Sequence, residues 1–391
     1  MRITLATQSY IPPHNGQAVF SQNLVAGLVE AGHQVQVIAP AEGHEGAGKN
    51  GVQMVRVPAI PLAPRYHDAY VTLLAGGRAD RALSQFRPDV VHIQDHYPLC
   101  RAVAGQAQRQ GLPLLGTNHF VPRNISANLP LLRHWPGFMK RLLWRTVRLV
   151  FNRVDLATAP TETAAQLLRE HIRPPVVAVS CGVDTMRFAP QRGPGRAAWR
   201  RRFGLAPGTT MLLYVGRLAT EKRLDVILHA LARGTVPRVQ LAIAGRGRQR
   251  TELESLAARL QLGERIVFTG YVPAHNLPAL YQAADLFVMP GDVELQSLAT
   301  LEAMASGLPV LLADASALPE LVQEGDNGYL FRAGDASSAA ERLTALVAER
   351  DRWPQMGAAS RRIAEDHTLQ RTVAAYERLY GHLIAGGQAG L

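Results

Sequence analysis

The sequence has few cysteines and no apolar run of membrane-spanning length. Cys100 and Cys181 are the only cysteines among 391 residues, too few for a disulfide framework or a cysteine-based zinc site. No segment approaches the roughly 18 apolar residues that a membrane-spanning helix needs. The first residues, MRITLATQSYIPP, lack the layout of a cleavable signal peptide. These absences predict a globular protein of the cytoplasm.

Lysine is also scarce, although the chain is strongly basic. The formal net charge is +11, yet Lys49, Lys140 and Lys222 are the only lysines, so arginine carries almost all of the positive charge. A scattered arginine excess is one explanation. The functional alternatives are a phosphorylated substrate, an anionic membrane surface or nucleic acid. Charge alone does not choose among them, but no nucleic-acid-binding motif is present, so we expect no nucleic-acid partner.

The N-terminal segment ITLATQSYIPPHNGQAVF lacks the G-x-G-x-x-G pattern that binds dinucleotides. This absence argues against an enzyme of hydride transfer. Gly16 stands just before a predicted helix, Ala18–Ala31, where a residue without a side chain lets the backbone approach a ligand, although a plain turn glycine is an equally good explanation. Gly32 is predicted to close that helix in the left-handed conformation.

What the chain does have is an alternation of short apolar runs and helical patterns, which is typical of parallel α/β architecture. The length exceeds what one hydrophobic core serves, so two domains are expected. A Pro-, Gly- and Arg-rich segment that reads as a linker with a short helix separates them. We place an N-terminal domain at 1–185, a C-terminal domain at 186–367, and a final helix at 368–391 that could pack on either domain.

Both domains are predicted to be doubly wound sheets that face each other. Ligands of such sheets bind at the carboxyl ends of the strands, so the default site is the cleft between the domains. The predicted strands are Ile3–Ala6, Gln34–Ala39, Val90–Gln94, Leu114–Thr117, Leu156–Ala159, Val176–Val179, Met211–Val215, Gln240–Ala244, Ile266–Thr269, Leu286–Met289 and Val310–Leu312.

Two glutamates flank the start of a predicted helix in the stretch GDVELQSLATLEAMASGLPV. Ser297 is a good N-cap for a helix over Leu298–Ala305, which Gly307 ends. Glu294 precedes this helix and Glu302 lies within it. A helix N-terminus suits a phosphate, and carboxylates on both sides of it could accept hydroxyl groups. The alternative is that both glutamates are solvated surface residues.

The segment LLYVGRLATEKRLDVILHAL places two cations just beyond a strand end. After the turn at Gly216, Arg217 can grip two phosphate oxygens while Lys222 acts as a mobile point charge. Together they would neutralise a diphosphate and stabilise it as a leaving group. The alternative is that Lys222 pairs with Glu221 on the surface. The next strand ends in AIAGRGRQR, where Gly245 allows close approach of the backbone.

The joint occurrence of GRLATEK, two glutamates spaced E-x7-E, EAMASGLPV and EGDNGYLF resembles the retaining glycosyltransferases of the family 4 type. The resemblance implies the two-domain GT-B fold and assigns roles in donor binding. Arg217 and Lys222 would bind the nucleotide diphosphate, Glu302 the ribose hydroxyls and Glu294 the hydroxyls of the donor sugar. The backbone at Ser297, Leu298 and Ala299 would receive the distal phosphate.

The reaction that the resemblance implies is transfer of a hexose from a UDP- or GDP-sugar, most simply UDP-glucose, to a hydroxyl with retention of configuration. The two cations stabilise the departing diphosphate, one of whose oxygens takes the acceptor proton. Attack by Glu294 on the sugar carbon is the less favoured alternative. Asp292 with Glu294 could suggest a metal pair, but no Asp-x-Asp occurs, and we expect a metal-independent enzyme.

Acceptor residues are expected after two strands of the first domain. HIQDHYPLC places Asp95 and His96 past one strand end, and GTNHFVPRN places His119 past the next. A lone histidine is more often a packed or surface residue. In the resemblance, however, His119 matches the residue against the transferred sugar. Both strings are similar to those of bacterial diacylglycerol glycosyltransferases, which implies a lipid acceptor such as diacylglycerol.

A basic amphipathic segment, PGFMKRLLWRTVRLVFNR, is the candidate for contact with a membrane. Arg141, Arg145 and Arg148 share one face of the predicted helix, and Trp144 lies nearby. Such a helix could lie at an anionic inner membrane face, or it could be an ordinary domain helix. A transferase that uses a small polar acceptor, and a sugar-nucleotide binder or epimerase of the same fold, remain the other possible functions.

Overall fold

A computed structural model describes residues 1–10, 15–41, 51–61, 70–72, 75–122, 136–190, 195–206, 208–236 and 238–387. The chain divides into two compact units. The N-terminal unit contains the described residues up to Cys181 together with those from Leu369 onward, and the C-terminal unit spans Gly182–Thr368. The change of unit lies close to residue 185, where the sequence places the domain boundary, and the final helix belongs to the N-terminal unit.

The N-terminal unit is built on a seven-stranded parallel sheet of order β3-β2-β1-β6-β7-β8-β9. Its strands are β1 (Arg2–Ala6), β2 (Gln34–Pro40), β3 (Val52–Val57), β6 (Val90–Ile93), β7 (Leu114–Thr117), β8 (Leu156–Ala159) and β9 (Val176–Ala178). From β1 the chain proceeds to one edge and then returns to β6 on the other side of β1. The loops that follow β1 and β6 therefore diverge, which is where doubly wound sheets bind ligands.

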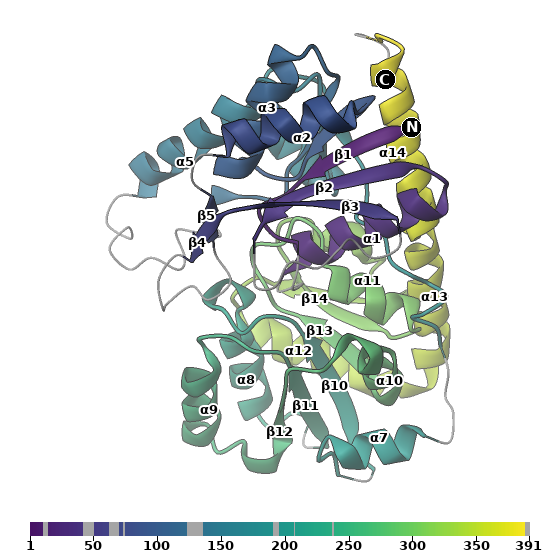
Figure 1. Ribbon diagram of the computed structural model, residues 1–391. Helices are drawn as coiled ribbons and strands as arrows, with labels where there is room; N and C mark the ends of the chain where they lie inside the picture. Colours follow the sequence, from purple (N-terminus) through teal and green to yellow (C-terminus); the bar gives the residue numbers. More distant parts are fainter. Residues whose placement is uncertain are drawn as a thin grey trace. The chain divides into compact units, whose positions relative to one another are not determined.

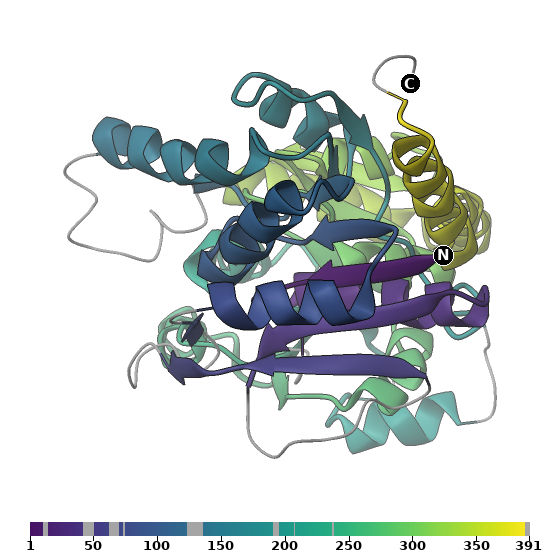
Figure 2. The same ribbon diagram turned by 45° about the horizontal axis from the view of Figure 1, so that its top comes forward.

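Helices cover both faces of this sheet (Figures 1 and 2). Helices α1 (Gly16–Glu30) and α14 (Leu369–Ile384) pack on each other and contact β2 and β6 respectively, whereas α3 (Pro98–Arg109) contacts β1, β6 and β7 on the other face. Helices α2 (Gly76–Phe86) and α5 (Pro136–Phe151) pack against α3, and α6 (Glu162–Arg169) packs on β8 and β9. Strands β4 (Ala59–Pro61) and β5 (Tyr70–Thr72) form a separate two-stranded antiparallel sheet.

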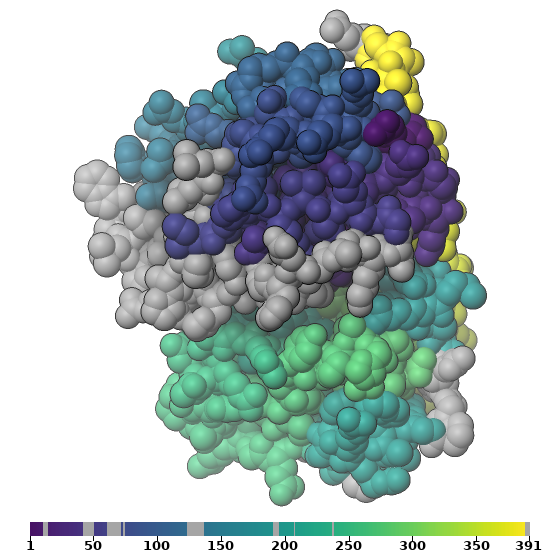
Figure 3. Space-filling model, viewed as in Figure 1, coloured from purple at the N-terminus to yellow at the C-terminus, as the bar shows by residue number. Residues whose placement is uncertain are grey.

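Helix α14 is fixed to the N-terminal unit by close packing and polar contacts. A Cβ atom on Gly27 of α1 would come within 2.4 Å of Val373 Cγ2, so the absence of a side chain at Gly27 permits the close approach of these helices. His33 Nε2 lies 2.7 Å from Glu377 Oε1. Figure 3 shows the yellow α14 beside the purple N-terminal residues. The end of the chain is thus a structural part of the first unit.

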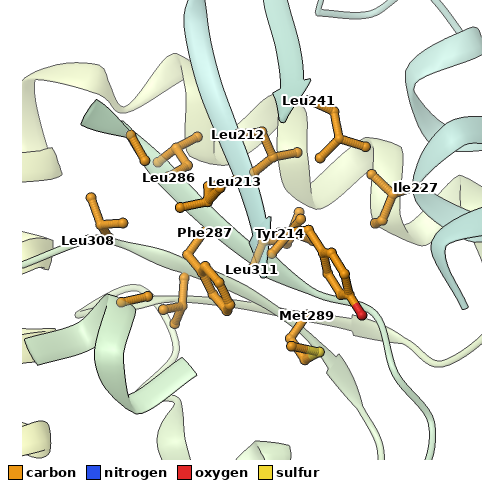
Figure 4. Packing of buried hydrophobic residues seen from close by; sticks show 14 of the residues in the cluster. Leu212, Leu213, Tyr214, Ile227, Leu241, Leu286, Phe287, Met289, Leu308 and Leu311 are labelled. Carbon is orange, nitrogen blue, oxygen red and sulfur yellow. The ribbon is translucent and has the colours of Figure 1, made fainter. Parts of the chain in front are cut away.

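The C-terminal unit repeats the design with six parallel strands of order β12-β11-β10-β13-β14-β15. They are β10 (Thr210–Val215), β11 (Val239–Ala244), β12 (Ile266–Gly270), β13 (Leu286–Met289), β14 (Val310–Asp314) and β15 (Gly328–Arg332). The strand order reverses between β10 and β13. Figure 4 shows the interior, where Leu212, Leu213 and Phe287 are fully buried because helices cover both faces of the sheet.

The longer helices of this unit form two packed sets. Helices α8 (Leu224–Ala232), α9 (Arg250–Arg259) and α12 (Ala336–Ala348) make one set, and α11 (Leu298–Ala305) packs on α13 (Trp353–Asp366) in the other. The short α7 (Arg196–Arg202), predicted in the linker, packs on α10 (Leu277–Ala283). Single 3-10 turns lie at Thr220–Lys222, Gly263–Arg265, Ala274–Asn276, Leu318–Leu321 and Arg350–Arg352.

All eleven predicted strands are present, and β7, β8 and β13 have the predicted bounds. The sequence patterns missed β3, β4, β5 and β15. Both β3 and β15 are edge strands. In β3 most residues are only partly buried, and Gln53 and Arg56 interrupt the apolar run that marks an interior strand. No helix within the described ranges is long and apolar enough to cross a membrane.

Candidate functional site

The loops after β10 and β13 are joined at the point where the strand order of the C-terminal unit reverses. Tyr214 at the end of β10 donates its hydroxyl hydrogen to the carbonyl oxygen of Arg217, at 2.8 Å. The backbone N–H of Asp292, after β13, donates to the carbonyl of Glu221, at 3.2 Å. These bonds fix the segment with Arg217 and Lys222 against the segment with Glu294. Lys222 and Glu294, which are 72 positions apart in the sequence, are thereby brought to one edge of the sheet.

Each predicted phosphate-binding cation has a carboxylate partner. Lys222 Nζ forms an ion pair with Glu294 Oε1, in which both side chains are largely buried, with exposed fractions of 18% and 8%. Arg217 Nη2 lies 2.5 Å from Glu221 Oε1, and its own side chain is 56% exposed. The alternative of a surface pair between Lys222 and Glu221 is therefore wrong. Ion pairs with carboxylates therefore hold both cations near the strand ends.

Gly245 allows the neighbouring loop to approach this segment closely. Its φ is +148°, and a Cβ atom there would lie 1.8 Å from the carbonyl oxygen of Gly216. The N–H of Gly216 donates to Ala244, and that of Gly245 donates to Gly270. The loops after β10, β11 and β12 thus form one layer of backbone, which any side chain at Gly245 would push apart. Whether Gly216 and Gly245 contact a donor stays a prediction.

Helix α11 begins as predicted. Ser297 is its N-cap, and the serine Oγ accepts a hydrogen bond from the N–H of Thr300 at 3.2 Å. Glu294 is 7% exposed, so the alternative that it is a solvated surface residue is wrong. The first turn of a helix, here at Leu298 and Ala299, presents N–H groups and a partial positive charge. Together with Lys222 and Arg217, this end of the unit offers several donors suited to an anion.

Glu302 lies on α11 and is held by a buried tyrosine. The hydroxyl of Tyr281 donates to Glu302 Oε2 at 2.7 Å. Burial raises the pKa of Glu302 to about 7, while the Tyr281 hydrogen bond and the positive charge of Arg187 oppose that shift. The second carboxylate oxygen can accept hydroxyl groups when Glu302 is ionised. A carboxylate immediately after the first turn of α11 is suited to a polyhydroxyl ligand that also carries a phosphate.

The reversal of strand order in the N-terminal unit is held together by Asp95. One carboxylate oxygen, Oδ2, accepts from the backbone N–H of Gln8 at 2.8 Å and from Nε2 of Gln17 at 2.9 Å. The other, Oδ1, accepts from the N–H of Tyr97 at 3.0 Å. Asp95 therefore fixes the loop after β6 to the segments before and within α1. Its role as an acceptor-binding residue stays a prediction, because these bonds already give it a structural function.

The two predicted histidines occupy different environments at neighbouring strand ends. His96 is 7% exposed and packs between the rings of Tyr97 and Phe120, with centroid distances of 4.7 and 4.5 Å. Burial lowers its pKa, and the carboxylate of Asp95 opposes that shift. His119 is partly exposed, and burial of its ring lowers the pKa to about 3. His119 is therefore neutral at physiological pH and better suited to contact a substrate than His96.

Gly16 is the first residue of α1, two positions before the predicted helix start, and is exposed. Asn15 caps the helix, accepting from the N–H of Ala18 at 2.9 Å. Gly32 has the predicted left-handed conformation, with φ of +85°. Sequence reasoning considered Glu221 only as a surface partner of Lys222, whereas it pairs with Arg217, and it missed Tyr281, which stands in none of the quoted motifs. Only the fold shows which charged or hydroxyl group each of them contacts.

The prediction for α5 needs a correction at Trp144. That side chain is 3% exposed and packs on His171 with ring centroids 3.7 Å apart, so it cannot contact a membrane. Arg141, Arg145 and Arg148 are exposed as predicted. The apolar residues of this helix lie in two environments, because Val147 and Val150 are buried whereas Phe138 and Leu142 are exposed. The helix thus packs on its unit and also presents apolar side chains to solvent.

Comparisons with known proteins agree with this arrangement. Residues 14–187 match the model of Glycosyltransferase Family 4, and residues 195–363 match that of Glycosyl transferases group 1. The chain is 30% identical over 394 residues to a GDP-mannose-dependent alpha-mannosyltransferase of Mycolicibacterium smegmatis, covering 98% of this chain and 97% of that protein. It is 26% identical over 359 residues to alpha-monoglucosyldiacylglycerol synthase of Streptococcus pneumoniae, covering 90% and 79%.

Among solved structures, Anabaena Alr3699/HepE in complex with UDP-glucose superposes with a TM-score of 0.77 at 19% identity, covering 97% of this chain and 99% of that chain. At that identity the likeness supports the fold, with its two parallel-sheet units, rather than the ligand. The two family models together span most of the chain and meet near the change of unit. The chain therefore belongs to the glycosyltransferases of group 1 and family 4, enzymes of the GT-B fold.

Proposed function

We propose that this glycosyltransferase moves a hexose from a nucleoside diphosphate sugar to a lipid hydroxyl with retention of configuration. The observation that carries the proposal is the grouping at the strand reversal of the C-terminal unit. Lys222 paired with Glu294, the exposed guanidinium of Arg217 and the capped start of α11 lie on segments joined by hydrogen bonds. The grouping contains cations for a diphosphate and carboxylates for hydroxyl groups on both sides of it.

In this proposal, the diphosphate binds at Lys222, Arg217 and the first turn of α11, and the cations stabilise the charge that develops as the sugar departs. Glu294 accepts hydroxyls of the sugar, and Glu302 accepts those of the ribose. A phosphate oxygen of the departing diphosphate removes the proton from the attacking hydroxyl, so no side chain has to act as the nucleophile. The positive side chains replace a metal ion. In the N-terminal unit, His119 contacts the acceptor.

The donor is proposed to be UDP-glucose, although the relatives named above point in two directions. The similar solved structure contains UDP-glucose, whereas the mannosyltransferase relative uses GDP-mannose according to its name. Thermal unfolding with UDP-glucose, UDP-galactose or GDP-mannose tests the choice. A ligand at 100 times its Kd should stabilise the native state by about 2.7 kcal/mol. When all three sugars are compared at one concentration, the donor that binds most tightly therefore gives the largest rise in Tm. If none of the three raises Tm, the proposed function is wrong.

The lipid acceptor is supported by the exposed face of α5. Phe138 and Leu142 are 61% and 41% exposed, and Leu149 is 40% exposed. Exposed cations, namely Lys140, Arg141, Arg145 and Arg148, alternate with them along the helix. Apolar side chains among cations are suited to the interface of an anionic bilayer. The relative named alpha-monoglucosyldiacylglycerol synthase makes a glycolipid according to its name, which agrees with an acceptor in such an interface.

The triple variant Arg141→Glu, Arg145→Glu and Arg148→Glu should lose binding to liposomes that contain anionic lipid. Each cation near such a surface contributes about 1 kcal/mol, so reversing three charges should weaken binding at least 100-fold. Flotation with liposomes is the measurement. The matched control reverses Arg201, Arg202 and Arg259, which are exposed on the C-terminal unit. Equal loss in both variants, or no binding by the unmodified protein, would point to a small polar acceptor instead.

A further inference from the structure

A chain of buried polar side chains lies behind His119 in the N-terminal unit. His119 Nε2 is 3.1 Å from Gln94 Oε1, and Gln94 Nε2 is 3.1 Å from Nε2 of His92. Both Gln94 and His92 are fully buried. His92 in turn lies 2.6 Å from Thr117 Oγ1 and 2.7 Å from the hydroxyl of Tyr380. The contacts connect the strand ends of β6 and β7 to helix α14.

The imidazoles of His92 and His119 are both neutral at physiological pH. Burial lowers the pKa of His119 to about 3. Burial, with a smaller effect from His119, keeps the pKa of His92 well below its ordinary value. A neutral imidazole has one N–H and one bare nitrogen, so the tautomer decides what the ring can bind. The carbonyl oxygen Oε1 of Gln94 can only accept, so a hydrogen bond to it requires a proton on Nε2 of His119 and leaves Nδ1 as an acceptor.

A second tyrosine of helix α14, Tyr376, also contacts Thr117 and His92. The hydroxyl of Tyr376 is 3.1 Å from Thr117 Oγ1, and its ring lies 5.1 Å from the ring of His92. Phe20 of α1 packs on the ring of His119 at 4.9 Å and on that of Tyr376 at 6.0 Å. His119 is thus held at its edge by Gln94 and on its face by Phe20. Phe20 contacts Tyr376 of α14 directly, and Gln94 is connected to Tyr380 of α14 through His92.

We propose that Gln94, backed by His92 and the two tyrosines of α14, is a positioning residue that fixes His119 as the Nε2–H tautomer and leaves Nδ1 to accept a substrate hydroxyl. The proposal rests on the proposed function for the identity of that substrate. It gives α14 a role beyond packing, because Tyr380 binds His92 and His92 contacts the amide that orients His119. It also explains why a glutamine is buried at the end of β6 beside two histidines.

The tautomer can be measured without any activity. Nitrogen NMR of the whole protein labelled with 15N-histidine should show a protonated Nε2 and a bare Nδ1 for His119, assigned by loss of the signals in His119→Ala. In Gln94→Met, which keeps the side-chain volume but has no amide, the two nitrogens should move toward a mixture of tautomers. Gln106→Met is the control, since Gln106 is another buried amide of this unit, and it bonds Gly76 and Arg109. A protonated Nδ1 in the unmodified protein would overturn the proposal.

Kinetics test the consequence for transfer. Gln94→Met should lower kcat/KM about tenfold, the loss of about one hydrogen bond, while the Kd for the free nucleoside diphosphate stays unchanged. Tyr380→Phe should lower kcat/KM in the same direction. In a His119→Ala background, Gln94→Met should have no further effect. A tenfold loss that persists in that background, or an unchanged kcat/KM in Gln94→Met, would overturn the positioning role. If the unmodified protein neither binds a nucleotide nor transfers a sugar, the proposed function fails, and NMR alone still decides the tautomer.

Discussion

Replacing Lys222 by alanine lowers kcat for sugar transfer by about 10³-fold. Removal of one preorganised donor to developing charge costs about 10² to 10³ in kcat. Lys222 belongs at the upper end of that range because its side chain is only 18% exposed, where screening by water is weak. Arg217 cannot compensate, since it is 56% exposed and is paired with Glu221. Transfer from the donor that the thermal screen identifies, measured under saturating conditions, checks the result.

The ion pair with Glu294 requires a control for folding. Lys222→Ala leaves the buried carboxylate of Glu294 without its partner, which costs about 3 to 5 kcal/mol of stability. The double variant Lys222→Ala with Glu294→Gln removes that unpaired charge, so it should regain stability in denaturant unfolding. It should remain inactive, because the leaving group still lacks its cation. Recovery of activity along with stability would show that Lys222 acts on the fold rather than on the diphosphate.

Local sequence signals predicted the parts of the site that depend on neighbouring residues. The start of α11 is the best example, since Ser297 caps the helix and Gly307 follows it in the left-handed conformation. A hydroxyl that bonds the first turn and a glycine that tolerates positive φ act within a few residues, so the sequence contains the whole cause. The interior strands were predictable for a similar reason, because burial on both faces demands a continuous apolar run.

Contacts between distant residues were not predictable in this way. Glu221 is next to Lys222 in the sequence, yet Lys222 pairs with the distant Glu294 and Glu221 pairs with Arg217. These partners are set by the contact between the loops after β10 and β13, which the sequence does not show. Trp144 was expected near a membrane because of its neighbours on the helix, but α5 turns it toward His171. Helical spacing shows which residues share a face, whereas the packing of that face depends on residues elsewhere in the chain.

Replacing Glu302 by glutamine weakens binding of the nucleotide sugar about 10- to 100-fold. A hydrogen bond to a charged group contributes about 1.5 to 3 kcal/mol, and the neutral amide offers a weaker acceptor to the ribose hydroxyls. Calorimetry with the intact donor measures the loss. Glu341→Gln is the matched control, because Glu341 is exposed on α12 of the same unit. A Kd that is unchanged in Glu302→Gln would remove Glu302 from the donor site.

The pH dependence separates the charge of Glu302 from its shape. Because burial raises its pKa to about 7, donor affinity should increase as pH rises through 7 and the carboxylate ionises, and Glu302→Gln should abolish that increase.

The free energy of unfolding should change with pH in the opposite direction to donor affinity. The folded state holds a proton that the unfolded state releases near pH 4.5, so the contribution of Glu302 is fully present below that pH and is lost as pH rises through 7. Unfolding of the ligand-free protein at pH 6 and pH 8 should therefore show a fall of about 1 to 2 kcal/mol that Glu302→Gln lacks. Donor affinity and stability that fall together across this range would mean that another group titrates.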